Sequence, residues 1–474
     1  MTIRVAVNGF GRIGRDVLRI ATDRAAMGEK DIEIVAVNDI TDPATLAHLL
    51  RHDSTYGPFA HHVTAGENSI SVDGRSLLVC AEREPQRLPW RDLGVDLVIE
   101  ATGKFRTAEK AGAHLTAGAR KVVITAPGKK VDATIVLGVN EESYRPGEHH
   151  IISNASCTTN CLAPMLSVLH HTFGVRRGLM TTIHSYTNDQ NLLDGPHKDL
   201  RRARSAAVNL IPTSTGAAAA IGEVLPELAG RLAGVAVRVP VENGSLTDLT
   251  VEVAATDVTA GQVNRAFADA ADGRMKSILR YTEEPIVSRD ILGEPASCVV
   301  DGSLTTVENQ LVKVFGWYDN EWGYANRTLD QPAALRVGVE EAAYQGSRLG
   351  DPQTVRAGWL PGRLPAPGGV AGDPAERGRG GGRVGEAGRD RNALVDQSAH
   401  RGQLPRPRHE DGLAGTPRDP GDRGDRVTEG GRHPGGEDRV DVLVGQQDVQ
   451  AVAEDLGGHG GRGVDRVGQA GLFG

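Results

Sequence analysis

The sequence predicts an α/β protein with a Rossmann-type, doubly wound parallel sheet, followed by an α+β catalytic domain with a mixed or antiparallel sheet and a disordered C-terminal tail. Three observations lead to this prediction. A glycine-rich loop lies between a strand and a helix near the start, a cysteine follows a later strand, and the composition changes sharply near residue 330. We therefore expect a dinucleotide-binding domain over 1–155, a catalytic domain over 156–330 and the tail over 331–474.

The bulk composition excludes several classes of protein. The chain has 474 residues, a net charge of −8 and only four cysteines. A negative balance gives no general attraction to nucleic acid or to an anionic membrane. No apolar run reaches the roughly 18 residues of a spanning helix, and the first residues enter a strand without a secretory leader. We expect a cytoplasmic protein with no nucleic-acid or membrane partner.

The glycine loop predicts a dinucleotide site. Residues 4–7 form a short apolar strand, and Gly9, Gly11 and Gly14 follow with the spacing Gly-x-Gly-x-x-Gly before a helical segment. In such a loop the first glycine allows a tight turn and the second lets the backbone approach a pyrophosphate. The third permits close packing of the helix on the strand. The pattern is weak alone in a glycine-rich chain, but its place between strand and helix strengthens it.

The ends of the next strands extend this site. A strand over 33–37 is followed by Asp39, which is placed to accept hydrogen bonds from a ribose diol. Its charge would repel a 2′-phosphate, which favours NAD over NADP. The alternative is an aspartate that only caps a turn. Strands over 95–99 and 121–124 end in small residues that leave room for a cofactor, among them Thr102, Gly103 and Thr125.

Cys157 follows an apolar strand and opens a segment with helical spacing. Free N–H groups and the dipole at a helix start stabilise a thiolate, so we expect its pKa to lie well below the free value of roughly 8.5. A thiolate beside a nicotinamide site indicates oxidation of an aldehyde through a covalent thioester. We interpret Cys161, one turn later, as a small packed residue. A metal site, which we do not expect, and a strained disulfide are the alternatives.

Basic and hydroxyl residues follow in the second half of the chain. His184 ends a strand over 178–183 and could take the thiol proton, although a structural histidine is the simpler interpretation of that residue alone. A basic cluster over 198–204 precedes hydroxyls and a glycine over 212–216, and together they could bind phosphate rather than form a solvated face. Further strands of an antiparallel sheet are expected over 235–238, 247–254 and 311–318.

Four motifs, in order over about residues 1–330, resemble glyceraldehyde-3-phosphate dehydrogenase of the bacterial type. They are Asn-Gly-Phe-Gly-Arg-Ile-Gly-Arg at 8–15, Ala-Ser-Cys-Thr-Thr-Asn-Cys at 155–161, His-Ser-Tyr-Thr at 184–187 and Trp-Tyr-Asp-Asn-Glu-Trp-Gly at 317–323. The resemblance implies attack of Cys157 on the aldehyde, with His184 as acid and base. It implies NAD as cofactor, a thioester that inorganic phosphate cleaves to 1,3-bisphosphoglycerate, a role in glycolysis and a homotetramer.

The resemblance also implies further site residues. To the cofactor contacts it adds Arg12, Ile13, Asp39, Arg83, Thr125 and Asn320, with Tyr324 as an aromatic residue near the nicotinamide. To the phosphate of glyceraldehyde 3-phosphate it assigns Thr187 and Arg238. To the attacking phosphate it assigns Ser156, Thr158, Thr215 and Gly216, and Arg202 matches a further phosphate-binding position. A related erythrose-4-phosphate dehydrogenase and a defective variant remain alternatives.

Two features depart from the family pattern. Ala219 stands where many members have lysine, and the terminal helix of the family is expected to be replaced from about Gln331, with a loss of stability or cofactor affinity. The 144 residues from 331 onward hold 32 of the 60 glycines and no lysine, isoleucine, methionine or cysteine. Such a composition cannot bury a core, and it is typical of GC-rich DNA translated in a wrong frame. An RNA-binding arm is disfavoured because 21 acidic residues outnumber 19 arginines there.

Overall fold

The amino-terminal part of the chain forms a nine-stranded sheet in the order β3-β4-β5-β2-β1-β6-β7-β9-β8. The structure is a computed structural model that describes residues 2–334. Within them the strands of this sheet are β1 (Ile3–Asn8), β2 (Ile32–Asn38), β3 (Val63–Ala65), β4 (Ser69–Val72), β5 (Arg75–Cys80), β6 (Leu97–Glu100), β7 (Lys121–Ile124), β8 (Ala133–Thr134) and β9 (Ile151–Ser153). The strands from β5 to β8 in that order pair in parallel, so the predicted doubly wound parallel sheet is confirmed.

The order of the strands reverses at β1. This strand has β2 on one side and β6 on the other, and the chain leaves it through α1 (Arg12–Ala26). Open parallel sheets bind ligands where the strand order reverses in this way. The apolar runs of β1 and β6 are almost wholly buried, as expected for strands covered on both faces by helices. The other helices of this domain are α2 (Pro43–Arg51) and α3 (Ala108–Thr116).

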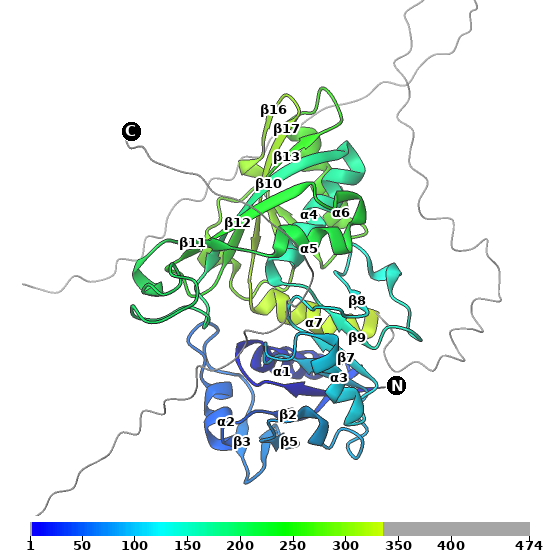
Figure 1. The fold of residues 1–474 in the computed structure, drawn as a ribbon, viewed down its shortest axis with the longest axis vertical. Helices are drawn as coiled ribbons and strands as arrows, with labels where there is room; N and C mark the ends of the chain where they lie inside the picture. Colours follow the sequence, from blue (N-terminus) through cyan, green and yellow to red (C-terminus); the bar gives the residue numbers. More distant parts are fainter. Residues whose placement is uncertain (1, 335–474) are drawn as a thin grey trace, which may run out of the picture. The chain divides into compact units, whose positions relative to one another are not determined.

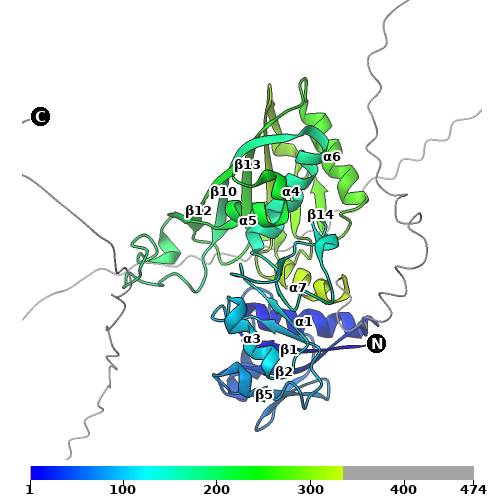
Figure 2. The same ribbon diagram turned by 45° about the vertical axis from the view of Figure 1, so that its right-hand side comes forward.

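The second sheet has the order β11-β12-β10-β13-β17-β15-β14, with β16 paired to β17. Its strands are β10 (Val175–Ser185), β11 (Ile211–Ser214), β12 (Leu232–Val239), β13 (Ser245–Val253), β14 (Leu279–Thr282), β15 (Cys298–Asp301), β16 (Thr306–Glu308) and β17 (Leu311–Tyr318). Two pairings are parallel and the others antiparallel, so the sheet is mixed, as predicted. One of its faces is covered by the helices α4 (Cys157–Phe173), α5 (Ala217–Val224) and α6 (Ala260–Asp272), as Figure 2 shows.

The last described helix, α7 (Trp322–Ala334), lies between α1 and α4, where Figure 1 shows it in yellow-green. Arg24 of α1 pairs with Asp330 at 2.7 Å, and Arg327 donates to the Ser277 carbonyl at 2.7 Å. The helix therefore fastens the amino-terminal domain to the catalytic domain. Among residues 2–334 no helix is long and apolar enough to cross a bilayer.

The structure corrects the expected start of the tail. Residues 331–334 continue α7, and the buried amide of Gln331 donates to the Asn154 side chain at 2.7 Å and to the Ile135 carbonyl at 2.9 Å. These contacts with the amino-terminal domain explain why the helix passes the point at which the composition changes. The rest of the expected disordered tail, 335–474, lies outside the described residues.

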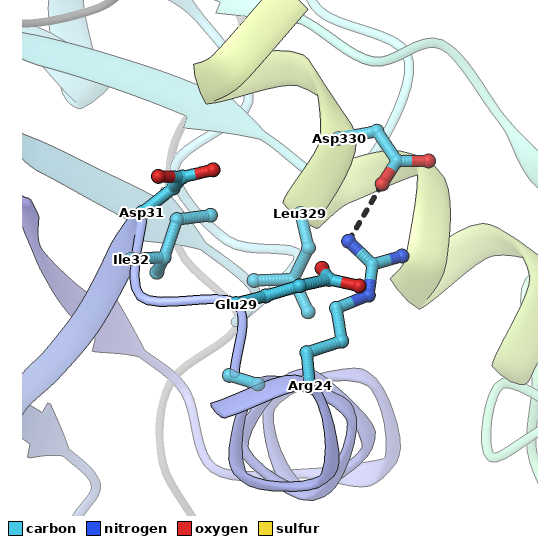
Figure 3. Close-up of a pocket in the computed structure, with 7 residues that line it drawn as sticks. Arg24, Glu29, Asp31, Ile32, Leu329 and Asp330 are labelled. Carbon is cyan, nitrogen blue, oxygen red and sulfur yellow. Dashed lines mark hydrogen bonds and ion pairs between the residues drawn. The ribbon is translucent and has the colours of Figure 1, made fainter. Parts of the chain in front are cut away.

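A cavity of about 200 Å³ lies at the junction of α1 and α7 (Figure 3). Its wall includes the ion pair between Arg24 and Asp330. None of the predicted site residues belongs to its lining, which consists of Ala21, Arg24, Glu29, Asp31, Ile32, Leu329 and Asp330. This cavity is therefore separate from the predicted cofactor site at the carboxyl ends of the parallel strands.

Candidate active site

Cys157 is the first residue of α4, directly after a sharp turn from β9. The preceding Ala155 has a φ of +53°, a left-handed conformation that residues other than glycine rarely adopt. Ser156 caps the helix, because its hydroxyl accepts from the Thr159 N–H at 3.0 Å. The hydroxyl of Tyr324 donates to the Ala155 carbonyl at 2.9 Å. Tyr324, predicted as a cofactor contact, thus also holds the turn that presents the cysteine.

His184 faces this cysteine from the end of β10, with its Nε2 at 3.4 Å from Sγ of Cys157. In the register of the sheet, His184 stands beside Arg238 of β12. The Ser185 carbonyl lies 2.8 Å from Nδ1 of His184 and can only accept, whereas Arg238 contacts the same Nδ1 and can only donate. These two contacts favour opposite tautomers, and the one with its proton on Nδ1 leaves Nε2 as the acceptor toward the thiol. Arg238 also donates to the Ser185 carbonyl at 3.0 Å.

Both members of this pair are neutral at neutral pH. Burial, and then the charge of Arg238, lower the pKa of His184 to about 3. Burial raises the pKa of the Cys157 thiol, although Arg238 and hydrogen bonds at Thr158 act in the opposite direction. The expectation of a strongly lowered thiol pKa is contradicted, because the loss of solvent outweighs the helix start. Attack by sulfur therefore requires transfer of its proton, and Nε2 is the nearest acceptor.

Sequence reasoning assigned no role to Tyr318, which the structure places beneath the pair. Its hydroxyl lies 2.9 Å from Oγ1 of Thr158 and 2.8 Å from Oγ1 of Thr182, and its ring stands edge-on to His184. It thereby joins the first turn of α4 to β10. The alternating burial along β17 placed Tyr318 inside, but its partners are more than 100 residues away in sequence.

Four of the predicted anion-binding residues, Thr187, Arg202, Thr215 and Gly216, lie on the segment that leads from β10 to α5, whereas Arg238 lies on β12. Arg202 donates to Oγ1 of Thr213 at 3.0 Å and pairs with Asp189. Burial is the main reason that the pKa of Arg238 is lowered, and the charge of Arg202 adds to this, so the two cations are within electrostatic range. The charge of Arg238 acts on the Cys157 thiol, so an anion bound beside the thiol would meet a cation there.

The other predicted members of the phosphate sites have mostly local contacts. The Thr187 N–H donates to the Gln190 side chain at 3.3 Å, and the Thr215 hydroxyl accepts from the Ala217 N–H at 3.2 Å. Gly216 precedes α5 and provides no side-chain cap, so beyond the Ala217 N–H, which Thr215 binds, the first turn of that helix has no capping side chain. Ala219 is exposed on the same helix.

The glycine loop fits a pyrophosphate. Gly9 has a φ of +95°, and a Cβ on Gly14 would lie 2.2 Å from the Gly9 carbonyl oxygen. A Cβ on Gly11 would meet nothing within 4 Å, so the backbone is open there, at a helix start with no side-chain cap. The half-buried Ile13 packs on the core of the domain. The Arg12 side chain pairs with Glu321 at 2.7 Å and with Asp53, so it ties the loop to the catalytic domain.

The carboxylate of Asp39 holds the same loop. It accepts from the Phe10 N–H at 2.9 Å and from the Thr41 N–H at 3.1 Å. The alternative role as a turn cap is therefore real, but a carboxylate accepts about four hydrogen bonds and can also bind a diol. Arg83 is exposed nearby, one residue after Glu82, whose backbone is bonded to the side chain of Asn38.

The remaining predicted cofactor contacts lie on neighbouring strand ends. Thr125 donates through both its N–H and its hydroxyl to the Glu100 carbonyl, each at 3.0 Å. Thr102 donates to the carboxylate of Glu100, and Gly103 turns with a φ of +70°. Oδ1 of Asn320 accepts from two serine hydroxyls, Ser185 and Ser245, which directs its amide nitrogen as the donor toward a ligand.

Cys161 is a free cysteine in the apolar core, so its interpretation as a packed residue is confirmed. Cys157 and His184 are brought together with Arg238 and Thr158. The cofactor residues Gly9, Gly11, Gly14, Asp39, Thr102 and Thr125 gather at the carboxyl ends of the parallel strands. Arg83 makes no polar side-chain contact within residues 2–334.

Comparison with known proteins gives the same assignment over most of the described chain. Residues 3–108 match the family model "Glyceraldehyde 3-phosphate dehydrogenase, NAD binding domain", and residues 156–320 match the corresponding "C-terminal domain". Glyceraldehyde-3-phosphate dehydrogenase 1 of Streptomyces avermitilis is 58% identical over 338 residues, which are 71% of this chain and 99% of that protein. The enzyme of Geobacillus stearothermophilus is 54% identical over 336 residues, 71% of this chain and 98% of its own. The chain belongs to the glyceraldehyde-3-phosphate dehydrogenase family.

Proposed function

We propose that this chain catalyses the NAD-dependent oxidative phosphorylation of glyceraldehyde 3-phosphate to 1,3-bisphosphoglycerate in glycolysis. The observation that carries the proposal is the distance of 3.4 Å between Sγ of Cys157 and Nε2 of His184, with Arg238 beside them. Membership of the family supports the same reaction. Residues 1–155 would supply the cofactor site, and residues 156–330 the thiol, the base and the anion sites.

The residues of the pair take the following roles. Sγ of Cys157 attacks the aldehyde carbon while Nε2 of His184 accepts the thiol proton, which gives a hemithioacetal. The imidazolium gives this proton to the hemithioacetal oxyanion and takes it back from the hydroxyl as the carbon is oxidised. Bound NAD would supply the hydride acceptor for this oxidation, which leaves a thioester on Cys157. An oxygen of inorganic phosphate attacks this thioester, the carbon–sulfur bond breaks, and the leaving thiolate recovers its proton from the imidazolium of His184.

Two anions must be held around one thiol in this reaction. We assign the phosphate of the substrate to Arg238 and Thr187, with Arg202 at a further phosphate position. We assign the attacking phosphate to hydroxyl and N–H groups near the starts of α4 and α5. The residues are Ser156, Thr158, Thr215 and Gly216. The charges of Arg202 and Arg238, which act on each other, support this assignment.

The cofactor site is proposed along the carboxyl edge of the parallel sheet, from Asp39 at β2 across the glycine loop to the turn before Cys157. The open backbone at Gly11 supports contact with the pyrophosphate. The carboxylate of Asp39 supports a preference for NAD over NADP, because it would repel a 2′-phosphate. The other proposed contacts are Gly9, Arg12, Ile13, Gly14, Arg83, Thr102, Gly103, Thr125, Asn320 and Tyr324.

A cytoplasmic homotetramer is the proposed form of the enzyme. Large apolar side chains are exposed on the segment between β10 and β12: Leu192 is 74% exposed and Leu200 is 81% exposed. Clustered exposed apolar residues mark contact surfaces between proteins. Size-exclusion chromatography with light scattering tests this, and a monomer at micromolar concentration would contradict it.

The reaction is tested by NADH formation at 340 nm with glyceraldehyde 3-phosphate, NAD and phosphate. We expect turnover that requires phosphate or arsenate, and only slow turnover with NADP. Turnover without either anion, or faster turnover with erythrose 4-phosphate, would contradict the proposed substrate. A folded chain that yields no NADH in the first turnover would contradict the proposed activity.

A further inference from the structure

A chain of hydrogen bonds runs beneath the proposed cofactor site and ends on Glu100, the last residue of β6. Glu100 is only 1% exposed and lies on the strand next to β1. A buried carboxylate is costly unless every oxygen has donors. Two series of hydrogen bonds lead to Oε2 of Glu100, one from the backbone of Glu82 and one from the side chain of Trp90.

The first end begins at the backbone of Glu82. Asn38 accepts the Glu82 N–H at 2.9 Å and donates to the Glu82 carbonyl at 2.9 Å, so the orientation of its amide is fixed. The same nitrogen of Asn38 donates to Oδ1 of Asn8 at 2.7 Å. Asn8 must therefore direct its own nitrogen to the carboxylate, at 2.5 Å from Oε2 of Glu100.

The second end begins at Trp90, whose indole nitrogen can only donate. It lies 3.1 Å from Nδ1 of His114, so this nitrogen accepts and carries no proton. In the neutral ring the proton is then on Nε2, which lies 3.1 Å from Oε2 of Glu100 and donates to it. The ring of His114 is wholly buried, so this tautomer has no competing contact with solvent.

The other oxygen of Glu100 faces the turn after β6. Oε1 accepts from the Thr102 N–H at 2.9 Å and from the Thr102 hydroxyl. All four partners of the carboxylate are thus donors, and a protonated carboxyl would place its hydrogen against one of them. A Cβ on Gly9 would lie 2.7 Å from the Thr102 nitrogen, so this turn is in direct contact with the glycine loop.

We propose that Glu100 is a positioning residue for the cofactor: its carboxylate, which accepts from four donors, fixes the Thr102–Gly103 turn against the glycine loop. Its side chain holds Thr102 and its carbonyl holds Thr125, so two of the proposed cofactor contacts depend on one residue. The inference rests on the proposed cofactor site and adds a residue that would not itself touch the cofactor.

The test is Glu100→Gln, which keeps the shape and removes the charge. Whichever way the new amide turns, its NH₂ meets at least one donor of fixed direction, either the Thr102 N–H or the pair Asn8 and His114. We expect the Kd and KM for NAD to rise at least about tenfold, while kcat at saturating NAD changes less than about twofold. The rate at which iodoacetamide alkylates Cys157 without NAD should stay unchanged. Glu109→Gln, an exposed isosteric change on α3, is the matched control and should change none of these values.

A merely structural role would give a different result. If Glu100→Gln lowers the melting temperature but leaves the Kd for NAD within twofold of the parent, the proposal is overturned. Calorimetric NAD binding separates this outcome from failure of the proposed function, in which the parent enzyme itself would not reduce NAD with the triose phosphate.

Two further measurements keep the proposal testable if Glu100→Gln does not fold. Asn8→Ala removes one of the four donors without changing a proposed cofactor contact and should raise the Kd for NAD in the same direction by a smaller factor. Nitrogen-15 NMR of the parent should find the ring proton of His114 on Nε2, where the Trp90 contact at Nδ1 places it. A proton on Nδ1, or an unchanged Kd in Asn8→Ala, would overturn the proposal.

Discussion

Two buried polar regions of this molecule, the Cys157–His184 pair and the cluster around Glu100, differ in how firmly their contacts fix the position of each proton. In the cluster every oxygen of the carboxylate has two donors. In the pair Nδ1 of His184 contacts both an acceptor, the Ser185 carbonyl, and a donor, Arg238, and burial shifts both pKa values away from the charged forms. Contacts that agree fix a proton in place, whereas contacts that conflict leave it free to move during a reaction.

The largest test of this contrast removes the group whose proton must move. Cys157→Ser should lower the rate of NADH formation by about a thousandfold or more, because an alcohol is far less acidic than a thiol. The Kd for NAD should be retained, since the cofactor edge is built from other residues.

The matched control is Cys80→Ser, which changes a half-buried cysteine outside the pair. It should keep most of the activity. A Cys157→Ser enzyme with near-normal turnover would remove Cys157 from the reaction and shift attention to Cys161.

The second test changes the cation that shapes the pair. Arg238→Gln should raise the KM for glyceraldehyde 3-phosphate by about 10- to 100-fold, the usual cost of losing a charged hydrogen bond to a phosphate. It should also raise the pKa of His184 from about 3, because the positive charge that disfavours the imidazolium is gone. Proton NMR of the imidazole gives the second value. Arg238→Lys keeps the charge and should show a smaller pKa shift, and an equal shift in both variants would contradict the role of charge.

The third test is the pH dependence of alkylation of the thiol without substrate. The pKa of Cys157 is raised and His184 is neutral above about pH 3, so the thiolate is a minor form at neutral pH. The rate of inactivation by iodoacetamide should therefore rise about tenfold per pH unit between pH 6 and 8. A rate that is already constant over this range would show a thiolate–imidazolium pair and would break the contrast with the Glu100 cluster.

The same contrast explains which parts of the site could be predicted from sequence. The glycine loop and the start of α4 are local patterns, and the structure has Gly9, Gly14 and Cys157 where the sequence implied. The pKa of Cys157 could not be predicted from its helix position, because burial by distant segments decides it. The Glu100 cluster was missed because its members, such as Asn8, are 92 residues apart in sequence, and no spacing rule links them.

The continuation of α7 was missed for a related reason. The composition changes near residue 331, but Gln331 is buried and its partners are Ile135 and Asn154, nearly 200 residues earlier. Local composition predicted that the folded part ends before residue 331, whereas the long-range hydrogen bonds of Gln331 keep this residue within α7.

The smallest test concerns Asp16, a buried residue of α1 in which neither carboxylate oxygen has a hydrogen bond within residues 2–334. If hydrogen bonding decides which carboxylates stay charged, Asp16 should differ from Glu100. Burial raises its pKa well above the ordinary 3.8, so the folded state holds its proton more tightly than the unfolded chain does. Its contribution to stability is therefore lost as the pH rises above about 4, since folding must then take up a proton or bury a charge.

Asp16→Asn has no charge to bury and should melt about 2–4 °C higher than the parent at pH 7, a gain of about 1 kcal/mol. The gain should shrink as the pH falls through the ordinary 3.8 and vanish below about pH 3, where the carboxyl is protonated in both states. Thermal melts of the two proteins at about pH 3 and pH 7 measure this difference. A lower melting temperature for Asp16→Asn at pH 7 would mean that the Asp16 charge stabilises the fold. Arg12 is the cation whose charge acts on Asp16. An unbonded carboxylate would then be as firmly ionised as Glu100, and the number of hydrogen bonds would no longer separate fixed protons from mobile ones.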